Sequence, residues 1–149
     1  MGTIELPPDL SEFLRLLSSH DVEYLLVGGY AVGLHGYPRT TGDMDVWVNP
    51  TAENASKLVN ALVDFGYAAS NLSPAPFTDP AKIVRLGVPP VCIDLIMSIS
   101  GVDFASSYAR RKHDESTGVS VSLIGLEDLK ANKRAAGRPK DIDDLNYLP

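Results

Sequence analysis

Two carboxylates at alternate positions are the residues of this chain best suited to chemistry. Asp43 and Asp45 flank Met44 at the start of the run Asp-Met-Asp-Val-Trp-Val, which predicts a strand over 44–48. In a strand, residues i and i+2 share a face, so both carboxylates point the same way. Two like charges this close repel unless a cation such as Mg²⁺ neutralises them. The pair therefore indicates a Mg²⁺ site, with two solvated acids at a strand end as the simpler interpretation.

A third carboxylate, Asp94, is the only charged residue in the apolar stretch Val91–Met97. Burying an unpaired carboxylate is costly, so Asp94 needs a partner. If this stretch is a strand beside 44–48, Asp94 joins Asp43 and Asp45. Three carboxylates can hold two metal ions about 3.5–4 Å apart for in-line phosphoryl chemistry, and one can accept a proton from an attacking hydroxyl. Otherwise Asp94 is a buried acid satisfied by the backbone or by an arginine.

A pair of glycines precedes these acids, at the end of a strand-like segment over 23–27. Five of the twelve glycines fall between Gly28 and Gly42. Glycine lets the backbone approach a ligand closely, and free N–H groups where a strand turns into a helix can bind a phosphate. A tight turn without a ligand is an equally simple interpretation of Gly28-Gly29. Neither a P-loop nor a Gly-x-Gly-x-x-Gly sequence is present.

Two amphipathic helices are predicted by the spacing of apolar residues. Asp9 and Glu12 form a capping-box pattern at the start of the first helix. Its apolar residues, at helical spacing, are Leu10, Phe13, Leu14 and Leu17. Thr51 caps the second helix, and Gly66 ends it. The predicted core face of that second helix consists of Ala55, Leu58, Val59, Leu62 and Val63.

The remaining segments predict a small mixed sheet with helices packed on it. Further strands are expected over 82–86, 91–96 and 119–124, and the connection 87–90 predicts a hairpin. Further helices are expected over 30–35, 102–112, 126–136 and 141–148. Segments 36–42 and 70–80 have the composition of loops. No linker divides the chain, so we expect one domain over residues 1–149.

The overall charge is acidic but unevenly distributed. The 13 Lys and Arg against 19 Asp and Glu give a net charge of −6, which argues against a protein that coats DNA or membranes. Eight of the thirteen basic residues nevertheless lie between Arg110 and Lys140. No apolar run approaches the roughly 18 residues of a membrane span, and the N-terminus lacks the pattern of a signal peptide. The single cysteine, Cys92, suits a reducing cytosol, so we expect a cytoplasmic protein.

Together these motifs resemble the signature of the DNA-polymerase-β-type nucleotidyltransferases. Val27-Gly-Gly is followed, after thirteen residues, by Asp43-Met-Asp-Val, and later by Ile93-Asp-Leu. The segment 28–45 is similar to the small bacterial branch, which includes abortive-infection toxins of type IV toxin–antitoxin systems and lincosamide-type antibiotic nucleotidyltransferases. The segment 126–145 resembles the helical end of the toxin-like members. The resemblance implies an α/β (α+β) nucleotidyltransferase fold with a small mixed sheet, flanking helices and a short helical C-terminus.

The resemblance also assigns roles to the residues that match the motifs. Asp43, Asp45 and Asp94 would be catalytic and would bind Mg²⁺, with two ions expected and Mn²⁺ as an alternative. Asp94 would also help to activate the acceptor hydroxyl. The residues that would bind the nucleotide are Gly28, Gly29, Arg39, Thr41, Lys130 and Lys133. For the last four of these, solvated surface charge or turn chemistry is an equally simple interpretation.

Two features depart from the family pattern. Gly29 stands where many active members have a serine whose hydroxyl binds phosphate, so a lower NTP affinity is expected. The chain also ends soon after the core, so specificity is expected to come from loop 70–80, from the region 110–140 or from a partner subunit. Other Asp-x-Asp enzymes fit less well. Trp47 stands where haloacid-dehalogenase-type phosphatases need a small hydroxyl residue, and 149 residues is short for a metal-dependent glycosyltransferase.

We therefore expect an enzyme that transfers a nucleoside monophosphate from an NTP to an acceptor hydroxyl and releases pyrophosphate. The acceptor is an RNA such as tRNA or a small-molecule alcohol, and the protein is expected to act as a toxin with an antitoxin partner or as an antibiotic nucleotidyltransferase of the lincosamide or aminoglycoside type. A different alternative is a catalytically weak or inactive module that binds nucleotides or regulates a partner. No membrane partner is expected. His35 and His113 fit neither a metal site nor a catalytic triad.

Overall fold

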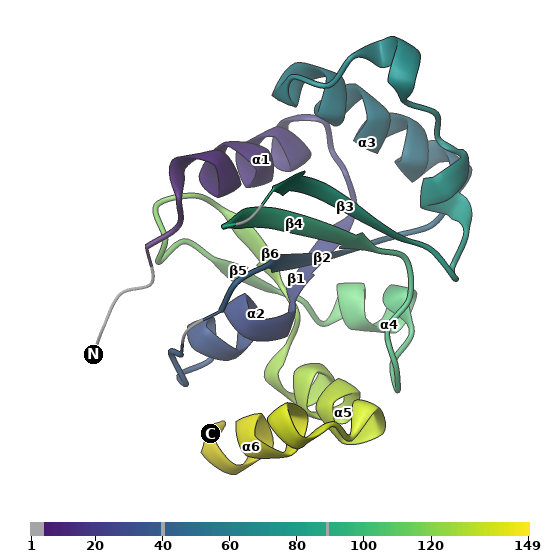
Figure 1. The fold of residues 1–149 in the computed structure, drawn as a ribbon. Coiled ribbons are helices and arrows are strands. Elements are labelled where there is room, and N and C mark those ends of the chain that lie inside the picture. Colours follow the sequence, from purple (N-terminus) through teal and green to yellow (C-terminus); the bar gives the residue numbers. More distant parts are fainter. Residues whose placement is uncertain (1–4, 40, 89) are drawn as a thin grey trace.

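Within the described part of the chain, six strands form one mixed sheet at the centre of the molecule (Figure 1). The structure is a computed structural model that describes residues 5–39, 41–88 and 90–149. The strands are β1 (Tyr24–Val27), β2 (Met44–Val48), β3 (Ile83–Val88), β4 (Val91–Ile96), β5 (Lys112–Asp114) and β6 (Val121–Leu123). Their order across the sheet is β3-β4-β2-β1-β6-β5. The predicted fold class, a small mixed sheet flanked by helices, is confirmed.

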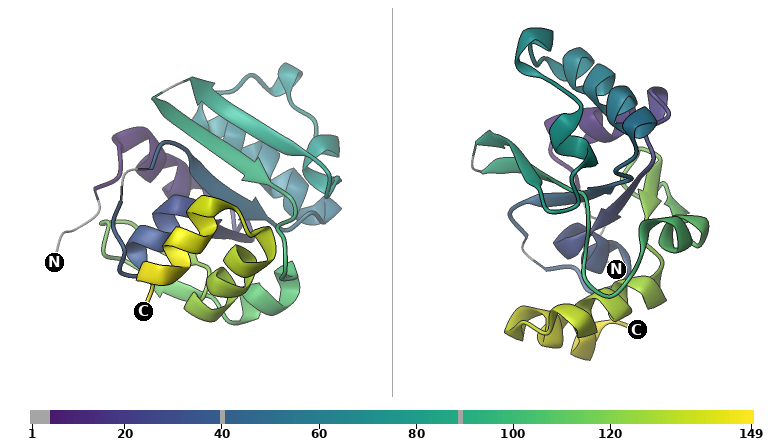
Figure 2. Two further views of the ribbon diagram at one scale, coloured as in Figure 1. Left: turned by 60° about the horizontal axis from the view of Figure 1, so that its bottom comes forward. Right: turned by 90° about the vertical axis from the view of Figure 1, so that its right-hand side faces the viewer.

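Helices cover both faces of this sheet (Figures 1 and 2). The helices are α1 (Pro8–Ser19), α2 (Gly28–Leu34), α3 (Ala52–Phe65), α4 (Phe104–Ala109), α5 (Leu126–Ala136) and α6 (Pro139–Tyr147). The first and third pack against each other on one face, whereas α2, α5 and α6 lie on the opposite face. The predicted loop over 70–80 contains two short 3₁₀ helices, Ala69–Asn71 and Ala75–Thr78.

Helix α1 buries the predicted apolar face but begins differently from the prediction. Leu10, Phe13, Leu14 and Leu17 are all buried. The N-cap is Pro7 rather than Asp9, and no side chain caps the helix. Pro8 supplies the start instead, because its fixed φ suits the first helical turn and it has no N–H to satisfy. Asp9 then lies inside the first turn, where its negative charge interacts favourably with the positive end of the helix dipole.

Helix α3 follows its predicted limits, although one residue of the predicted core face is exposed. The Thr51 hydroxyl accepts a hydrogen bond from the backbone N–H of Asn54, and Gly66 ends the helix with a φ of 125°. Val63 is 37% exposed, and Ala61 is fully buried in its place. The buried stripe is therefore rotated toward Asn54 and Ala61 relative to the prediction, because a polar residue, Asn54, is drawn into the core by its hydrogen bonds.

The segment 102–124 differs most from the prediction. A helix was expected over 102–112, but α4 ends at Ala109, and residues 112–114 form the edge strand β5. Asp103 starts α4 by accepting a hydrogen bond from the N–H of Ser106. The residues of β5, Lys-His-Asp, pair with β6 at the rim of the sheet. All three are polar, so no alternation of apolar residues could indicate a strand.

The pairing of β2 with its neighbours fixes the position of the acidic residues. Strand β2 runs antiparallel to β1 and parallel to β4. In the parallel pair, Asp45 lies directly opposite Asp94. The conditional prediction that the strand carrying Asp94 lies beside 44–48 is therefore confirmed. On the far side of β4, the antiparallel strand β3 places Arg85 opposite Asp94.

Two predicted connections include a residue outside the described ranges, namely residue 40 in the loop 36–42 and residue 89 in the hairpin connection 87–90. The hairpin itself is confirmed by the antiparallel pairing of β3 with β4. Over the described part of the chain, no helix combines the length and the apolar character needed to cross a membrane.

A buried asparagine joins α3 to the sheet. The Asn54 side-chain oxygen accepts a hydrogen bond from the N–H of Glu23 at 2.7 Å, and its amide group donates to the carbonyl oxygens of Glu23 at 3.0 Å and Asn49 at 2.9 Å. These bonds satisfy backbone groups just before β1 and just after β2. The Asn54 side chain therefore holds the start of β1 and the end of β2 against α3.

We predict that Asn54→Ala lowers the free energy of unfolding by roughly 2 kcal/mol, because buried backbone groups lose their partners. Asn60→Ala on the exposed side of the same helix is the matched control and is expected to change stability by less than about 0.5 kcal/mol. Urea unfolding followed by circular dichroism measures both variants. Equal stability of the two variants would contradict the role given to Asn54.

Candidate active site

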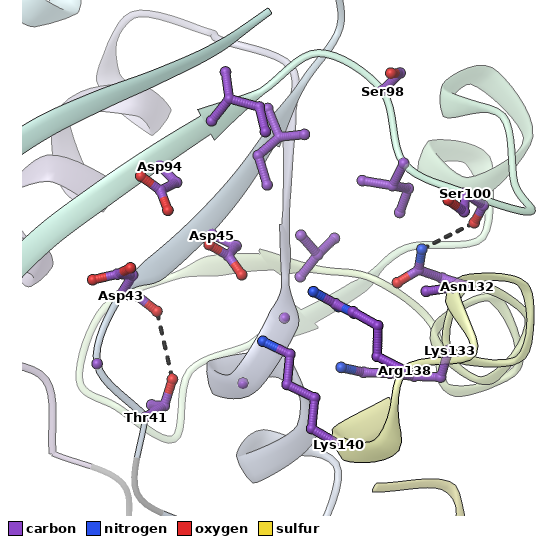
Figure 3. A pocket seen from close by; sticks show the side chains of 18 of the residues that line it. Thr41, Asp43, Asp45, Asp94, Ser98, Ser100, Asn132, Lys133, Arg138 and Lys140 are labelled. Atoms are coloured by element: carbon purple, nitrogen blue, oxygen red, sulfur yellow. Dashed lines mark hydrogen bonds between the residues drawn. The ribbon is translucent and has the colours of Figure 1, made fainter. Parts of the chain in front are cut away.

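A cavity of about 730 Å³ lies where the central strands face the C-terminal helices (Figure 3). Its walls come from the end of β1, the start of α2, the loop before β2, strands β3 and β4, and helices α5 and α6. Eight of the nine site residues predicted from the sequence line it. They are Gly28, Gly29, Arg39, Thr41, Asp43, Asp45, Asp94 and Lys133.

The three predicted carboxylates share one edge of this cavity. Asp45 and Asp94 are opposite each other on parallel strands, and Asp43 projects from the same face of the chain two residues earlier. Gly28 lies against them with a φ of 68°, and any Cβ at this position would overlap the carboxylate of Asp45. Glycine is therefore required at position 28 both by the backbone conformation and by the proximity of the acid.

An arginine that the sequence analysis missed binds two of the three acids. Arg85 donates from Nε to Asp94 at 2.9 Å, and from one terminal nitrogen to Asp94 at 3.1 Å and Asp43 at 2.6 Å. These bonds raise the pKa of the guanidinium, with Asp94 as the largest cause. The sequence left the backbone or an arginine as the partner of a buried Asp94, and the structure shows an arginine. The predicted connection 87–90 gave no such register, whereas the observed strands extend to a Val88–Val91 pair, and this register places Arg85 opposite Asp94.

Asp45 is not bonded to Arg85, and its carboxyl group has a strongly perturbed pKa. Burial is the main cause, followed by the charges of Asp94 and then Asp43, and together they raise the pKa from 3.8 to about 6. The positive charges of Lys140 and Lys133 act in the opposite direction. Asp45 thus occupies the position where additional positive charge stabilises the site most.

The side chain of Thr41 fills the space beside Gly29. A Cβ at position 29 would lie 2.9 Å from the Cβ of Thr41 and still closer to its hydroxyl oxygen, and 3.4 Å from a terminal nitrogen of Arg39. The Thr41 hydroxyl also lies 3.5 Å from the carbonyl oxygen of Asp43, to which it donates. Position 29 consequently has no room for a side chain, and a threonine hydroxyl occupies the adjacent space.

Lys133 lines the cavity but is engaged in a buried ion-pair network. Its side chain is 4% exposed, and its amino group lies 3.1 Å from Asp141 and 3.1 Å from Asp144. Arg39 forms a bidentate pair with Asp144 at 2.8 and 2.9 Å, and Arg138 pairs with Asp141 at 2.7 Å. The network joins α5, α6 and the loop that leads to β2.

The pKa values of the two acids in this network are lowered. Burial alone would raise the pKa of Asp141, but hydrogen bonds from Arg138 and Lys133 outweigh it and lower the pKa to about 2. Burial likewise opposes the pKa shift of Asp144, and hydrogen bonds from Arg39 and Lys133 lower its pKa. Both acids are therefore ionised at neutral pH and hold the cations around them.

Lys130, the ninth predicted site residue, does not line the cavity. Its amino group donates to the carbonyl oxygen of Pro149 and lies 3.9 Å from Glu127. Two other basic residues line the cavity instead, namely Arg138, directly before α6, and Lys140, within α6. In Figure 3, Lys140 extends from α6 toward the carboxylates, and no ion pair or hydrogen bond to another described residue engages its amino group.

The opposite end of the cavity is more apolar. Ile83, Ile96 and Ile99 line this end together with Ser98, Ser100 and Asn132. The Asn132 amide group donates to the carbonyl oxygen of Ser100 at 2.9 Å, which leaves its side-chain oxygen directed into the cavity (Figure 3). The cavity therefore has a charged end at the carboxylates and an end suited to a less polar group.

Outside the cavity, His35 has a structural role. Its Nε2 lies 2.6 Å from the carbonyl oxygen of Ile124, so this nitrogen donates, and burial lowers the pKa of the ring. His113 lies on the exposed edge strand β5.

The fold of this chain is shared with a protein of known structure. A Thermotoga maritima protein of known crystal structure, provisionally named a nucleotidyltransferase, has the same fold with a TM-score of 0.61. The similarity covers 92% of this chain and 88% of that chain at 14% sequence identity, so it concerns the fold alone. A comparison with curated proteins yields no match.

The sequence comparison with protein families identifies the family directly. The family described as "Nucleotidyltransferase of unknown function (DUF6036)" matches residues 8–147. The chain belongs to this family of nucleotidyltransferases. The resemblance to the superfamily that the glycine pair and the acids carry is thereby confirmed.

The close approach of Thr41 to Gly29 makes a testable prediction. We expect Gly29→Ala to lower the free energy of unfolding by roughly 1–3 kcal/mol, because the new methyl group overlaps Thr41. Gly42→Ala is the matched control, since a Cβ there meets nothing within 4 Å. Adding Thr41→Gly to Gly29→Ala should recover part of the loss in a double-mutant cycle. Purely additive effects would show that the two side chains do not compete for space.

The perturbed pKa of Asp45 predicts a pH-dependent stability. Because folding raises this pKa from 3.8 to about 6, the contribution of Asp45 is fully present below pH 3.8 and is lost as the pH rises through 6. Asp45→Asn removes the charge, so we expect this variant to be more stable than the parent by on the order of 2 kcal/mol at pH 7.5. The difference should shrink toward zero near pH 4.

Denaturant unfolding between pH 4 and pH 8 measures this difference. The lowered pKa of Asp141 affects stability mainly at lower pH, because its contribution is lost as the pH falls from 3.8 through about 2. A parent protein that matches Asp45→Asn in stability at both ends of the range would refute the assignment.

Proposed function

We propose that this protein transfers a nucleoside monophosphate from an NTP to an acceptor hydroxyl in a Mg²⁺-dependent reaction. One observation carries the proposal: the parallel register of β2 and β4 places Asp45 beside Asp94. With Asp43 on the same face, three carboxylates line one end of a cavity whose opposite wall carries Lys140 and Arg138. Membership in a nucleotidyltransferase family supports the reaction class.

The reaction assigns a task to each end of the cavity. The acceptor oxygen attacks the α-phosphorus of the NTP, the bond from this phosphorus to the pyrophosphate oxygen breaks, and the hydroxyl proton passes to a carboxylate. We assign this proton to Asp94. The backbone of Gly28 and Gly29 and the Thr41 hydroxyl lie near the acids. We assign these groups to the phosphates. Lys140 faces the leaving pyrophosphate, and the apolar end around Ile99 and Asn132 holds the nucleoside.

The residues fit a divalent cation in their chemistry. Carboxylates together with substrate phosphates are the ligands that Mg²⁺ prefers, and Asp43, Asp45 and Asp94 would hold it. Burial, followed by the charges of Asp94 and Asp43, raises the pKa of Asp45, and a cation beside this carboxylate would favour its ionised form. When bound, Mg²⁺ would neutralise the phosphate charge and polarise the α-phosphorus.

The network around Lys133 gives Arg39 and Lys133 a positioning task. Both are bonded to Asp144, which is almost fully buried. We propose that they hold the loop before Asp43 and the helices α5 and α6 in the geometry that closes the cavity. The positive charge available to a triphosphate then comes chiefly from Lys140, with Arg138 beside it.

The basic stretch 110–140 is partly neutralised within the fold, and this bears on the acceptor. Arg110 pairs with Asp128 at 2.9 Å, Arg111 lies over the ring of Tyr108, and Lys133 is buried. An RNA such as tRNA or a small-molecule alcohol remains the proposed acceptor class, with toxin and antibiotic-modifying roles carried only by the resemblance of the motifs. An antitoxin partner is likewise proposed on that resemblance.

A second candidate function is a nucleotide-binding or regulatory module without turnover, and one observation favours it. Arg85 binds both Asp43 and Asp94. In the described ranges, no three His, Cys, Asp or Glu side chains are gathered closely enough to hold a metal ion. The carboxylates must therefore rearrange before they can act on a metal–nucleotide complex. A module would bind NTP and transfer nothing.

The transfer reaction predicts a sharp effect of two substitutions. Incubation of the protein with α-labelled NTPs, Mg²⁺ and either total cellular RNA or a panel of small alcohols should label one acceptor class. We expect Asp45→Asn to abolish labelling, and Asp94→Asn to reduce it by at least about 10²-fold while retaining nucleotide binding, because the proton acceptor is lost. Asp9→Asn, an exposed acid on α1, is the matched control and should keep the parent rate.

The outcomes separate the alternatives. Label in RNA with an affinity that falls steeply as salt rises indicates an RNA acceptor, because phosphate contacts release counterions. Label in an alcohol with little salt dependence indicates a small-molecule acceptor. NTP binding without any label favours the regulatory module, and full activity of Asp45→Asn would overturn the mechanism.

A further inference from the structure

Arg85 occupies the carboxylate oxygens that the proposed reaction requires for a metal ion. From β3, at the edge of the sheet, the guanidinium reaches across β4 and bonds both oxygens of Asp94 and one oxygen of Asp43. One side chain therefore neutralises part of the charge that the register of β2 and β4 brings together. The third acid, Asp45, receives no hydrogen bond from this guanidinium, and its pKa is raised.

The guanidinium and a divalent cation compete for the same oxygens. The bidentate pair takes one lone pair from each oxygen of Asp94 in the plane of the carboxylate and leaves fewer lone pairs to a metal ion. Two cations within a few ångströms of each other also repel. Bonding by Arg85 therefore weakens the binding of a metal ion to these acids.

The position of Arg85 allows it to leave the acids. Its side chain is 54% exposed, and it belongs to an edge strand rather than to the core. It is not one of the residues that line the cavity, so a guanidinium turned toward solvent leaves the cavity open. Asp94, in contrast, is only 13% exposed and cannot move far from β4. Of the two side chains, that of the arginine is therefore the one with room to move away.

We propose that Arg85 is a resident counter-ion of the carboxylate cluster that holds the site closed to metal ions until a nucleotide arrives. This inference rests on the proposed function, because it concerns the metal site of that reaction. A divalent cation alone must displace the guanidinium and is bound weakly. An NTP adds phosphate oxygens as ligands for the same cation, so metal and nucleotide bind cooperatively. By weakening the binding of the cation alone, Arg85 makes occupancy of the metal site depend on the presence of substrate.

Binding of Mn²⁺ to the protein without nucleotide tests the proposal directly. Free Mn²⁺ is measured by electron paramagnetic resonance for the parent, Arg85→Met, Arg85→Lys and Lys82→Met. Lys82 is an exposed cation on the same segment with no contact to Asp43 or Asp94, so its variant controls for the loss of one positive charge. Thermal unfolding confirms that each variant is folded.

We expect Arg85→Met to bind Mn²⁺ at least about ten-fold more tightly than the parent, because the guanidinium that competes for the carboxylate oxygens is lost. Arg85→Lys should lie between them. Lys82→Met should remain within about two-fold of the parent, since exposed charges at a distance are screened. Equal or weaker Mn²⁺ binding by Arg85→Met, with binding by the parent intact, overturns the role of Arg85 and leaves the proposed function standing. Absence of Mn²⁺ binding in every variant, both without nucleotide and with a non-hydrolysable NTP analogue, overturns both.

The coupling to nucleotide has its own readout. A non-hydrolysable NTP analogue should tighten Mn²⁺ binding in both the parent and Arg85→Met, because its phosphates add ligands in both proteins, and Arg85→Met should remain the tighter binder. In nuclear magnetic resonance spectra, the Nε–H signal of Arg85 should move on addition of Mg²⁺ and the analogue together. A signal that stays unchanged while the metal site saturates shows that Arg85 keeps its bonds, and this contradicts the proposal.

Discussion

Repulsion among three carboxylates on one face of β2 and β4 is the constraint around which the site is organised. The parallel register leaves Asp45 facing Asp94, and the alternation of a strand brings Asp43 to the same side. The surrounding residues respond to this charge. Gly28 brings only backbone to Asp45, Arg85 bonds the two outer acids, and the lysines of α5 and α6 lower the pKa of Asp45. A site that needs so many compensations is better explained by chemistry than by stability.

A second electrostatic constraint concerns the packing of the C-terminal helices α5 and α6, which bury charged side chains between them. Lys133 is buried, and its charge is matched by two acids of α6 that are themselves almost fully buried. Removing either side of such a network leaves an uncompensated charge, which is why the components depend on one another. Because Arg39 joins the network through Asp144, the loop before Asp43 is fixed to the same helices. The geometry of the acids is thus linked to a segment about a hundred residues later in the chain.

Much of the fold and the acidic part of the site could be predicted from the sequence, since both depend on local patterns. Helical spacing predicted α1 and α3, and apolar runs predicted β2 and β4. The polar edge strand β5 carried no such pattern. Arg85 was missed for a related reason, because a partner across a hairpin is a matter of register rather than of residue type. The predicted nucleotide-binding roles of Lys130 and Lys133 stay untested, but the spacing of the two lysines on one helix could not reveal that α6 carries the acids that bind Lys133.

The acidic net charge and the polyanionic substrate of the proposed reaction place a limit on how this site can recognise its ligands. A chain with a net charge of −6 repels a triphosphate at long range, and several of its basic residues are already paired with acids of the same chain. Attraction must therefore be local and must come from the few cations at the cavity, from backbone N–H groups and from metal ions carried by the nucleotide. Under that limit, a guanidinium that keeps the acids neutralised while the site is empty is an advantage, because it stabilises the fold without attracting metal ions in the absence of substrate. The same limit disfavours a broad phosphate-binding surface, so an RNA acceptor would be selected by contacts close to the reacting hydroxyl rather than by charge along its length.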